Sequence, residues 1–385
     1  MEWKVPLFDP DLGVEEAAAL AAVIESKWLT MGDRTRDFET AFTALTGASH
    51  AIAVSNGTTA LHLALLAVGV QPGDEVVCPA LTFVATANAV RYCGAVPVFA
   101  DVTSLEDWNV CRTTIEPLLS SRTRAILVVH YAGYVCDMAP ILALARARGL
   151  AVVEDVAHAP GASREGRAAG TWGDAGCFSF FSNKNLTTGE GGMVTTSRDD
   201  VAAKVRTLRS HGMTTLTLDR YKGHAFSYDV VALGYNYRMG ELNAALGLAQ
   251  VRHLAARNAR RREHVEYYRE RLEGLPELGI PFPCHPGVPA YHIMPVLLPP
   301  AADRNTVMTG LASRGVQCSI HYRPVDTFTA YQEAGLGPCS HLVQTHEIGR
   351  RELTLPLYPS MDGSHIDIVV DALESVMTAD ARVSQ

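Results

Sequence analysis

Short apolar segments alternate with helix-forming segments over the first 155 residues of the chain. The apolar segments have the length of buried strands, and the segments between them have the composition of helices. The predicted strands span 51–54, 75–79, 96–100, 125–129 and 151–154, and the predicted helices span 60–68, 82–92, 114–119 and 138–148. Strands and helices that alternate in this way form a mainly parallel sheet with helices on both faces. The predicted fold class is therefore α/β.

The two ends of the chain have a different pattern. Two helices are predicted before the first strand, at 14–27 and 34–45, and the second ends at Gly47. From 236 to about 272 the apolar residues recur at helical spacing, which predicts one long or kinked helix leaving the sheet. A strand at 292–298, a helix at 304–314, a strand at 317–321 and a helix at 367–377 are predicted after it. We therefore expect a large domain over 1–250 and a small α+β domain over 251–385.

Charge and cysteine content narrow the function classes. A net charge of -8 and a pI near 6.0 argue against a general nucleic-acid binder. The N-terminus lacks the pattern of a signal peptide, and no apolar run has the length of a membrane span. The eight cysteines form no CxxC pair, which favours reduced thiols. These features predict a soluble cytoplasmic enzyme.

Two polar segments follow predicted strands in the first half of the chain. The 56–59 junction, Asn-Gly-Thr-Thr, offers backbone N–H groups, hydroxyls and a glycine at a helix start, which suit a phosphate. A purely structural helix cap is the alternative. Asp155 follows the strand at 151–154, at the edge where parallel sheets bind ligands. There it could pair with the N–H of a pyridinium ring, or it could simply cap the next helix.

A single lysine, Lys184, lies between an apolar strand that begins at Cys177 and a glycine-rich turn. Desolvation in a cleft would lower its pKa and make the amine a nucleophile, whereas an ordinary surface lysine is the alternative. A phosphate site, a buried carboxylate and an isolated lysine are together what pyridoxal 5′-phosphate (PLP) requires. Phe83 could stack on the ring of this cofactor. The sequence has no GxGxxG after a strand, no P-loop, no GxSxG and no metal-ligand cluster.

The chain resembles the fold-type-I PLP enzymes, and within them the DegT/StrS sugar aminotransferases. The resemblance covers nearly the whole length, through the segments 28–32, 55–61, 79–87, 154–158, 177–192, 234–239 and 321–324. It implies a mainly parallel sheet of seven strands in a large PLP-binding domain, followed by a small α+β domain. At the last motif the chain departs from the family, because Pro324 is followed by Val-Asp where many members have Leu and then His.

The resemblance implies three catalytic residues. Lys184 would carry PLP as a Schiff base, Asp155 would pair with the pyridine nitrogen, and His158 would lie against the ring. The other implied cofactor contacts are Phe83 on a ring face and Gly57, Thr58, Thr59 and Ser179 at the phosphate. Asn236 matches a position that reaches the phosphate from the neighbouring subunit, which implies a homodimer with shared active sites. Asn185, His321 and Tyr322 are expected at the substrate.

The activity implied by the resemblance is ping-pong transamination in amino-sugar biosynthesis, with L-glutamate as donor and a nucleotide-linked keto-deoxysugar as acceptor. Lys184 would act as the general base and acid, and its presence favours amino transfer over the dehydration that lysine-lacking members perform. The segment 179–192 most resembles members that act on 4-keto-6-deoxyhexoses. A 3-keto sugar or a keto-cyclitol of the scyllo-inosose type is the alternative substrate. A non-catalytic PLP-binding regulator would need a DNA-binding or sensor segment, and no basic helix-turn-helix pattern is present.

Overall fold

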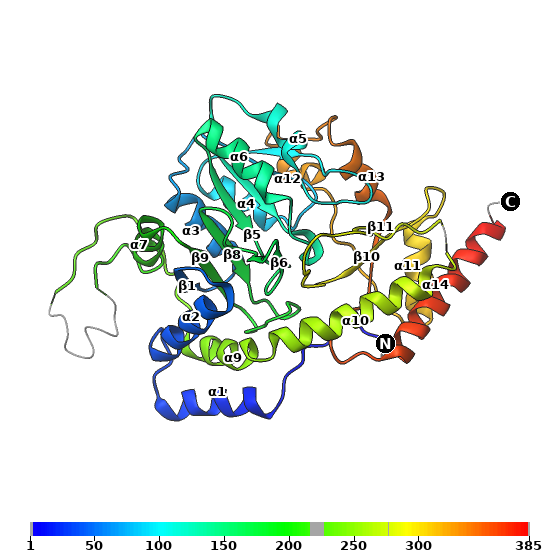
Figure 1. Cartoon of the computed structure of the whole chain (residues 1–385), viewed down its shortest axis with the longest axis horizontal. Coiled ribbons are helices and arrows are strands. Elements are labelled where there is room, and N and C mark those ends of the chain that lie inside the picture. Colours follow the sequence, from blue (N-terminus) through cyan, green and yellow to red (C-terminus); the bar gives the residue numbers. More distant parts are fainter. Residues whose placement is uncertain (1–2, 216–226, 276, 384–385) are drawn as a thin grey trace.

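A seven-stranded sheet forms the centre of the protein in a computed structural model that describes residues 3–215, 227–275 and 277–383 (Figure 1). The strand order is β1-β9-β8-β5-β4-β2-β3. The strands are β1 (His50–Val54), β2 (Glu75–Pro79), β3 (Val96–Ala100), β4 (Thr123–Val129), β5 (Ala151–Asp155), β8 (Ala175–Ser179) and β9 (Gly192–Thr196). β9 runs antiparallel to both of its neighbours, and the other pairs are parallel. The predicted mainly parallel sheet is confirmed.

Helices cover both faces of this sheet because successive strand residues point to opposite sides. In β1, Ile52 and Val54 belong to one core cluster, and Ala51 and Ala53 belong to the other. The first cluster includes residues of α3 (Gly57–Ala67), α4 (Ala85–Tyr92) and α7 (Asp199–Leu208). The second includes residues of α2 (Asp33–Thr46), α6 (Met138–Arg148) and α9 (Glu241–Val251).

Several predicted helix ends agree with the structure. The helix α1 (Val14–Ser26) lies where 14–27 was expected. The helix α2 ends at Gly47, whose φ of 74° is a left-handed conformation that glycine adopts easily because it has no side chain. Smaller elements of this part include α5 (Arg112–Ile115), the 3-10 helices η1 (Glu116–Leu118) and η2 (Tyr131–Gly133), and the two-residue strands β6 (Ser163–Arg164) and β7 (Arg167–Ala168). The helix α3 begins at Gly57, three residues before the predicted start at 60, because Asn56 caps it.

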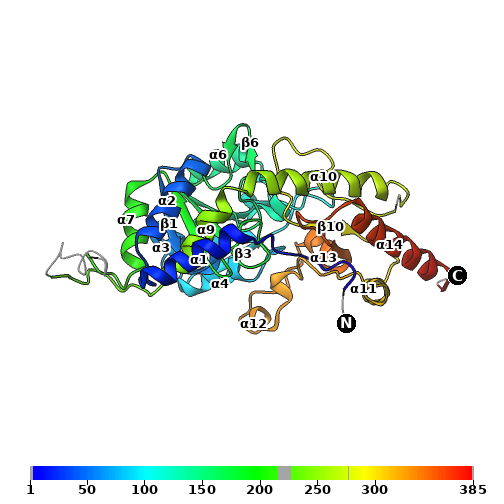
Figure 2. The same cartoon turned by 90° about the horizontal axis from the view of Figure 1, so that it is seen from below.

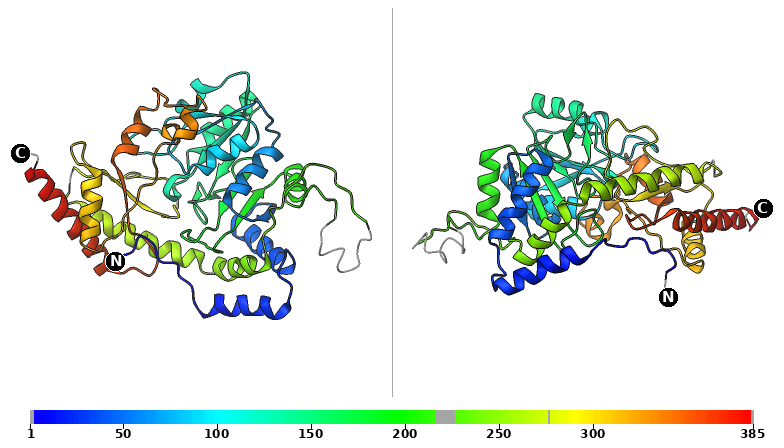
Figure 3. Two further views of the ribbon diagram at one scale, coloured as in Figure 1. Left: turned by 180° about the vertical axis from the view of Figure 1, so that it is seen from behind. Right: turned by 60° about the horizontal axis from the view of Figure 1, so that its bottom comes forward.

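The helical segment predicted from 236 to about 272 is not one continuous helix. It is interrupted, in line with the kinked form of that prediction. It consists of α9 and α10 (Leu254–Leu272), and α10 extends away from the sheet toward α14 (Gly363–Val383) and α11 (Arg304–Ser313) (Figure 2). The C-terminal part also contains α12 (Thr329–Gln332), α13 (Val343–Arg351), β10 (Met294–Leu297) and β11 (Glu352–Leu355). Both ends of the chain lie on this side of the molecule (Figure 3). The division at residue 250 remains a prediction, and Val5 joins the core of the C-terminal part.

The strand predicted at 317–321 is wrong. The partner of β10 is β11, and within 317–321 only Ser319 makes an isolated bridge, to Thr354. Its last residue instead donates its backbone N–H to a carboxylate, because His321 N lies 2.7 Å from Glu352 Oε2. In the part of the chain that the structure describes, no helix combines the length and apolar character needed to cross a membrane.

Candidate active site

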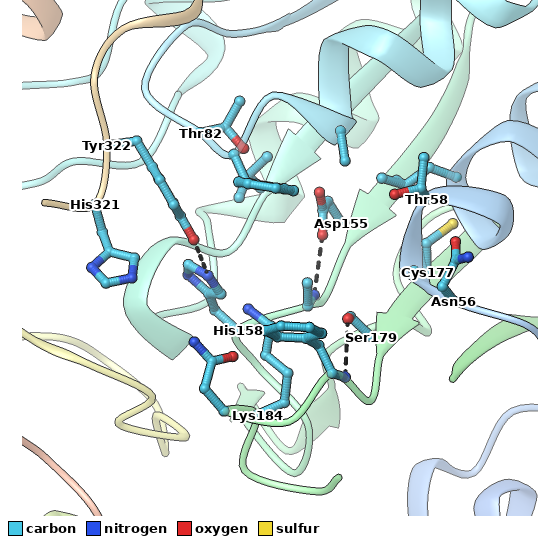
Figure 4. Close-up of a pocket in the computed structure, with 18 of the residues that line it drawn as sticks. Asn56, Thr58, Thr82, Asp155, His158, Cys177, Ser179, Lys184, His321 and Tyr322 are labelled. Atoms are coloured by element: carbon cyan, nitrogen blue, oxygen red, sulfur yellow. Dashed lines mark hydrogen bonds between the residues drawn. The ribbon is translucent and has the colours of Figure 1, made fainter. Parts of the chain in front are cut away.

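A cavity of about 410 Å³ opens at the carboxyl ends of β4, β5 and β8, where a parallel sheet places its ligands. The start of α3, the loop after β8 and the 321–322 segment of the small part complete its wall. The cavity therefore collects residues that are far apart in the sequence. Its lining includes the predicted site residues Gly57, Thr58, Phe83, Asp155, His158, Ser179, Lys184, His321 and Tyr322 (Figure 4).

Lys184 lies in the loop between β8 and β9, and hydrogen bonds within this loop hold it in place. Its backbone N–H donates to Phe181 O at 2.9 Å, and Phe180 N donates to Gly191 O at 2.8 Å. Burial lowers the pKa of Lys184 from its ordinary value to about 8, although the carboxylate of Asp155 opposes this shift. A substantial fraction of the amine is therefore unprotonated near neutral pH, as a nucleophile or a base needs to be.

Asp155 ends β5 and is held in the cavity by two donors. Ala157 N–H donates to Oδ1 at 3.1 Å, and Thr86 Oγ1 donates to Oδ2 at 2.9 Å. Because the Thr86 hydroxyl gives its hydrogen to Asp155, it accepts one from Thr82 Oγ1, 2.8 Å away. Burial raises the pKa of Asp155, and these donors and Lys184 limit the rise by favouring the ionised form.

The neighbouring Glu154 faces the opposite side of the strand. Its carboxylate accepts backbone N–H groups from Gly170, Trp172 and Gly173 at 2.7–2.9 Å and lies 3.0 Å from His130 Nε2. The acidic pair at 154–155 therefore divides into a structural carboxylate and one that faces the cavity.

His158 has a fixed tautomer. Ala132 N–H donates to its Nδ1 at 3.3 Å, so Nε2 carries the ring proton and donates to the Tyr322 hydroxyl at 2.8 Å. Burial, together with Lys184 and His321, lowers the pKa of His158 well below its ordinary value, so the ring is neutral. The hydrogen of the Tyr322 hydroxyl is then free to be donated elsewhere in the cavity.

The start of α3 and the end of β8 form an anion site. A Cβ at Gly57 would lie 2.7 Å from Ser179 Cβ, so a glycine is needed for the two elements to approach this closely. The Ser179 hydroxyl accepts from Phe181 N at 3.4 Å, which leaves its own hydrogen for a ligand. The N-terminus of α3 also favours negative charge. Thr59 lies in this turn, but its hydroxyl is used in the cap, donating to Asn56 O at 2.8 Å.

Three further predicted residues have distinct positions. Phe83 lines the cavity and is 56% exposed, so a ring face is available for stacking. Asn236 does not line the cavity of its own chain, and its backbone bridges to Ser210. Asn185, which we expected at the substrate, does not line the cavity either: its amide is buried against Asn258 and Ala290. The substrate contact expected of Asn185 stays a prediction that this burial does not support.

The sequence analysis missed several residues of the site. Thr82 and Thr86 fix Asp155, Glu352 fixes the backbone of His321, and His292 lies 3.4 Å from Lys184 Nζ. The pattern of threonines four residues apart before a helix was a usable signal for the first pair. His292 gave only the weak signal of a polar residue at the start of an apolar run.

The residues present fit PLP. The cavity has an anion site at the start of α3, a buried carboxylate suited to a pyridine N–H, an exposed aromatic ring and a lysine with a lowered pKa. These are the groups that a phosphorylated pyridine aldehyde needs at its phosphate, its ring nitrogen, its ring face and its aldehyde carbon.

Known proteins resemble the whole chain. The family model for the DegT/DnrJ/EryC1/StrS aminotransferase family matches residues 10–374. The spore coat polysaccharide biosynthesis protein SpsC of Bacillus subtilis (strain 168) is 38% identical over 378 residues, which cover 97% of each chain. The crystal structure of the aminotransferase TlmJ from Streptoalloteichus hindustanus is 34% identical with a TM-score of 0.89, covering 97% of this chain and 99% of that one. The PLP form of the putative sugar aminotransferase Spr1654 from Streptococcus pneumoniae is 26% identical with a TM-score of 0.91, covering 98% and 99%.

Proposed function

The chain belongs to the DegT/DnrJ/EryC1/StrS aminotransferase family and is a PLP-dependent sugar aminotransferase, and we propose that it transfers the amino group of L-glutamate to a nucleotide-linked 4-keto-6-deoxyhexose. A lysine with a lowered pKa and a buried carboxylate line the same cavity, and this arrangement carries the proposal. Phe181 also lines the cavity and is 45% exposed, so its ring suits the flat or apolar faces of a large acceptor.

Each group of the cofactor has a proposed partner in the chain. Gly57, Thr58 and Ser179 would hold the phosphate at the start of α3, and Asp155 would accept the pyridine N–H. Phe83 would cover a ring face, and His158 would lie against the ring. When bound, PLP supplies an electron-withdrawing ring that stabilises negative charge on the substrate carbon.

Lys184 is the proposed proton carrier. Its Nζ takes up the proton that leaves the substrate Cα and, as the ammonium, returns a proton within the cavity. A pKa of about 8 suits both directions of this transfer, because neither the amine nor the ammonium is rare near neutral pH. The free hydroxyl hydrogen of Tyr322 can be donated to a carbonyl or carboxylate oxygen of the substrate, and His321 lies beside it.

A homodimer with shared active sites is part of the proposal. Asn236 follows a segment with exposed apolar side chains, including Val231 at 61% and Leu233 at 88% exposure. Burial of these side chains against a second copy would remove apolar surface from water. It would also bring Asn236 to the phosphate site of the partner.

The setting we propose is amino-sugar biosynthesis in the cytoplasm. The similarity to a polysaccharide biosynthesis protein supports the pathway class. All eight cysteines are free, which is consistent with a reducing compartment.

The test is a transamination assay with defined acceptors. The purified protein, loaded with PLP, is incubated with L-glutamate and dTDP-, UDP- or GDP-4-keto-6-deoxyhexose, a 3-keto nucleotide sugar, or scyllo-inosose. Mass spectrometry of the amino sugar and an assay of 2-oxoglutarate report turnover. Lys184→Ala is the inactive variant, and Lys204→Ala, at an exposed lysine on α7, is the matched control.

We expect turnover with a 4-keto-6-deoxyhexose, the loss of at least about three orders of magnitude in Lys184→Ala, and unchanged rates in Lys204→Ala. Preferred turnover of the 3-keto sugar or of scyllo-inosose would replace the proposed acceptor. Full turnover by Lys184→Ala would refute the assignment of the lysine itself.

A further inference from the structure

The side chain of His292 is the closest polar neighbour of the lysine amine that none of the roles above uses. It lies just before β10, is 3% exposed, and places Nε2 3.4 Å from Lys184 Nζ. Its backbone is fixed on both sides of the residue. His292 N donates to Ala132 O at 2.9 Å, and the buried Arg261 donates to His292 O at 3.1 Å. These two backbone hydrogen bonds therefore hold the imidazole of His292 next to the amine of Lys184.

A chain of amides sets the direction of the hydrogen bonds around this imidazole. Asn258 Nδ2 donates to Pro160 O at 2.9 Å, so Asn258 Oδ1 is an acceptor. Asn185 Nδ2 donates to that oxygen at 2.8 Å and to Ala290 O at 2.7 Å. Asn185 Oδ1 must then accept, and its partner at 2.9 Å is His292 Nδ1. Nδ1 therefore carries the ring proton.

Because the proton is on Nδ1, Nε2 of the neutral ring presents a lone pair to Lys184. Burial, followed by the nearby cations and imidazoles, lowers the pKa of His292 well below its ordinary value, so the ring stays neutral. The ring of His292 thus offers the lysine a neutral, buried acceptor near neutral pH. Asp155, His158, Cys177, Glu190, His321 and Tyr322 are the other titratable groups that line the cavity with Lys184. Arg261 is the further charged group next to His292.

Building on the proposed role of Lys184, we propose that His292 is a positioning residue that accepts a hydrogen bond from the lysine whenever Nζ is not bonded to the cofactor. An amine that gives one N–H to His292 keeps its lone pair and its other N–H for the cavity. The lone pair is the part that takes a proton from the substrate Cα, and the ammonium so formed keeps the same acceptor. Asn185 serves this arrangement by fixing the tautomer, which accounts for its burial away from the substrate.

The pKa of Lys184 measures this contact without any catalytic step. The sequence contains five lysines, so protein labelled with 13C at lysine Cε gives few NMR signals, and Lys184→Ala assigns the relevant one. The full-length chain is titrated without cofactor and again with pyridoxamine 5′-phosphate, in which the lysine is free. The variants are His292→Leu, which removes the acceptor, and His292→Gln, which retains one. His264→Leu is the matched control, at a buried histidine on α10 whose Nε2 lies 3.4 Å from Pro359 O.

Loss of the acceptor should destabilise the ammonium, so His292→Leu should lower the Lys184 pKa by about 1, the size expected for a hydrogen bond to a charged donor. His292→Gln should recover at least half of that change, and His264→Leu should leave the pKa within about 0.2 of the wild-type value. Turnover in His292→Leu should fall about 10–100-fold in kcat with little change in KM, because a misdirected base slows proton transfer and not binding.

A second variant covers the case in which His292→Leu does not fold. Asn185→Ala leaves the imidazole in place but frees its tautomer, and it should lower the Lys184 pKa in the same direction by a smaller amount. An unchanged pKa in both His292→Leu and Asn185→Ala, or an equal change in His264→Leu, would overturn the proposal. The titration without cofactor requires no turnover. The proposal for His292 can therefore fail or succeed independently of whether the wild-type protein transaminates sugars.

Discussion

Replacement of Thr86 by valine is a sharp test of how the cavity carboxylate is held. Valine has nearly the shape of threonine, and Thr86 is fully buried, so the change removes the hydrogen bond to Asp155 Oδ2 and the one that Thr86 accepts from Thr82 Oγ1. Only the first of these two bonds depends on the charge of Asp155. A hydrogen bond to a charged acceptor contributes about 2 kcal/mol and one to a neutral acceptor about 1 kcal/mol. The substitution should therefore cost about 1 kcal/mol more when Asp155 is ionised than when it is protonated, and should raise the pKa of Asp155 by about 0.7.

The sign of the pH dependence follows from linkage. Burial raises the folded-state pKa of Asp155 above its unfolded value, so stability from this group is present at low pH and is lost as pH rises through the folded pKa. Thr86→Val raises that pKa further and enlarges the loss. Urea unfolding of the cofactor-free protein across a pH series should show a penalty that grows as pH rises through the folded pKa of Asp155, by about 1 kcal/mol in total.

Two matched variants complete the experiment. Thr86→Ser keeps the hydroxyl and should show little pH dependence. Thr345→Val removes another buried hydroxyl, one without a hydrogen-bond partner among the described residues, and should have the same effect throughout the pH series. A Thr86→Val penalty that stays constant across the whole series would refute the assignment of Thr86 as a donor to an ionisable Asp155.

Three further outcomes can be measured. Gly57→Ala should weaken PLP binding at least about 10-fold in an absorbance titration, because its Cβ has no room beside β8, whereas Gly13→Ala, which meets only ordinary contact, should not. Glu352→Gln should flatten the pH dependence of stability. Burial raises the pKa of Glu352 to about 7, so the wild type loses on the order of 2 kcal/mol between about pH 4.5 and 7 that the variant keeps, as urea unfolding across that range would show. Finally, coexpressed Lys184→Ala and Asn236→Ala chains should regain activity that neither variant has alone, and no recovery in a purified mixed dimer would contradict shared active sites.

The sheet was predictable because its strands are buried on both faces and are separated by helices. For such strands, apolar runs of limited length are a sufficient signal, and β2 and β3 begin and end at the predicted residues. Sequence pattern fails at residues 317–321, where polar and apolar residues alternate but most of the segment is only half-buried. Ser319 alone bridges to Thr354, and the backbone N–H of His321 is satisfied by Glu352 and not by a neighbouring strand. Sequence pattern reports burial, and only the fold decides which group satisfies the backbone.

Within the site, residues at the end of a strand or the start of a helix were easier to predict than residues in loops. Asp155 and Gly57 occupy positions that the topology fixes, since a strand end and a helix start each point in one direction. Asn185 comes directly after Lys184, yet its side chain points away from the cavity, because loop geometry turns successive side chains apart. Its partner His292 comes from a segment about a hundred positions later, so no local pattern could pair the two.

If the titrations support the role of His292, the lysine's chemistry depends on a contact between the large and small parts of the chain. Variation in the small part could then alter the pKa of the lysine without any change in the cofactor site.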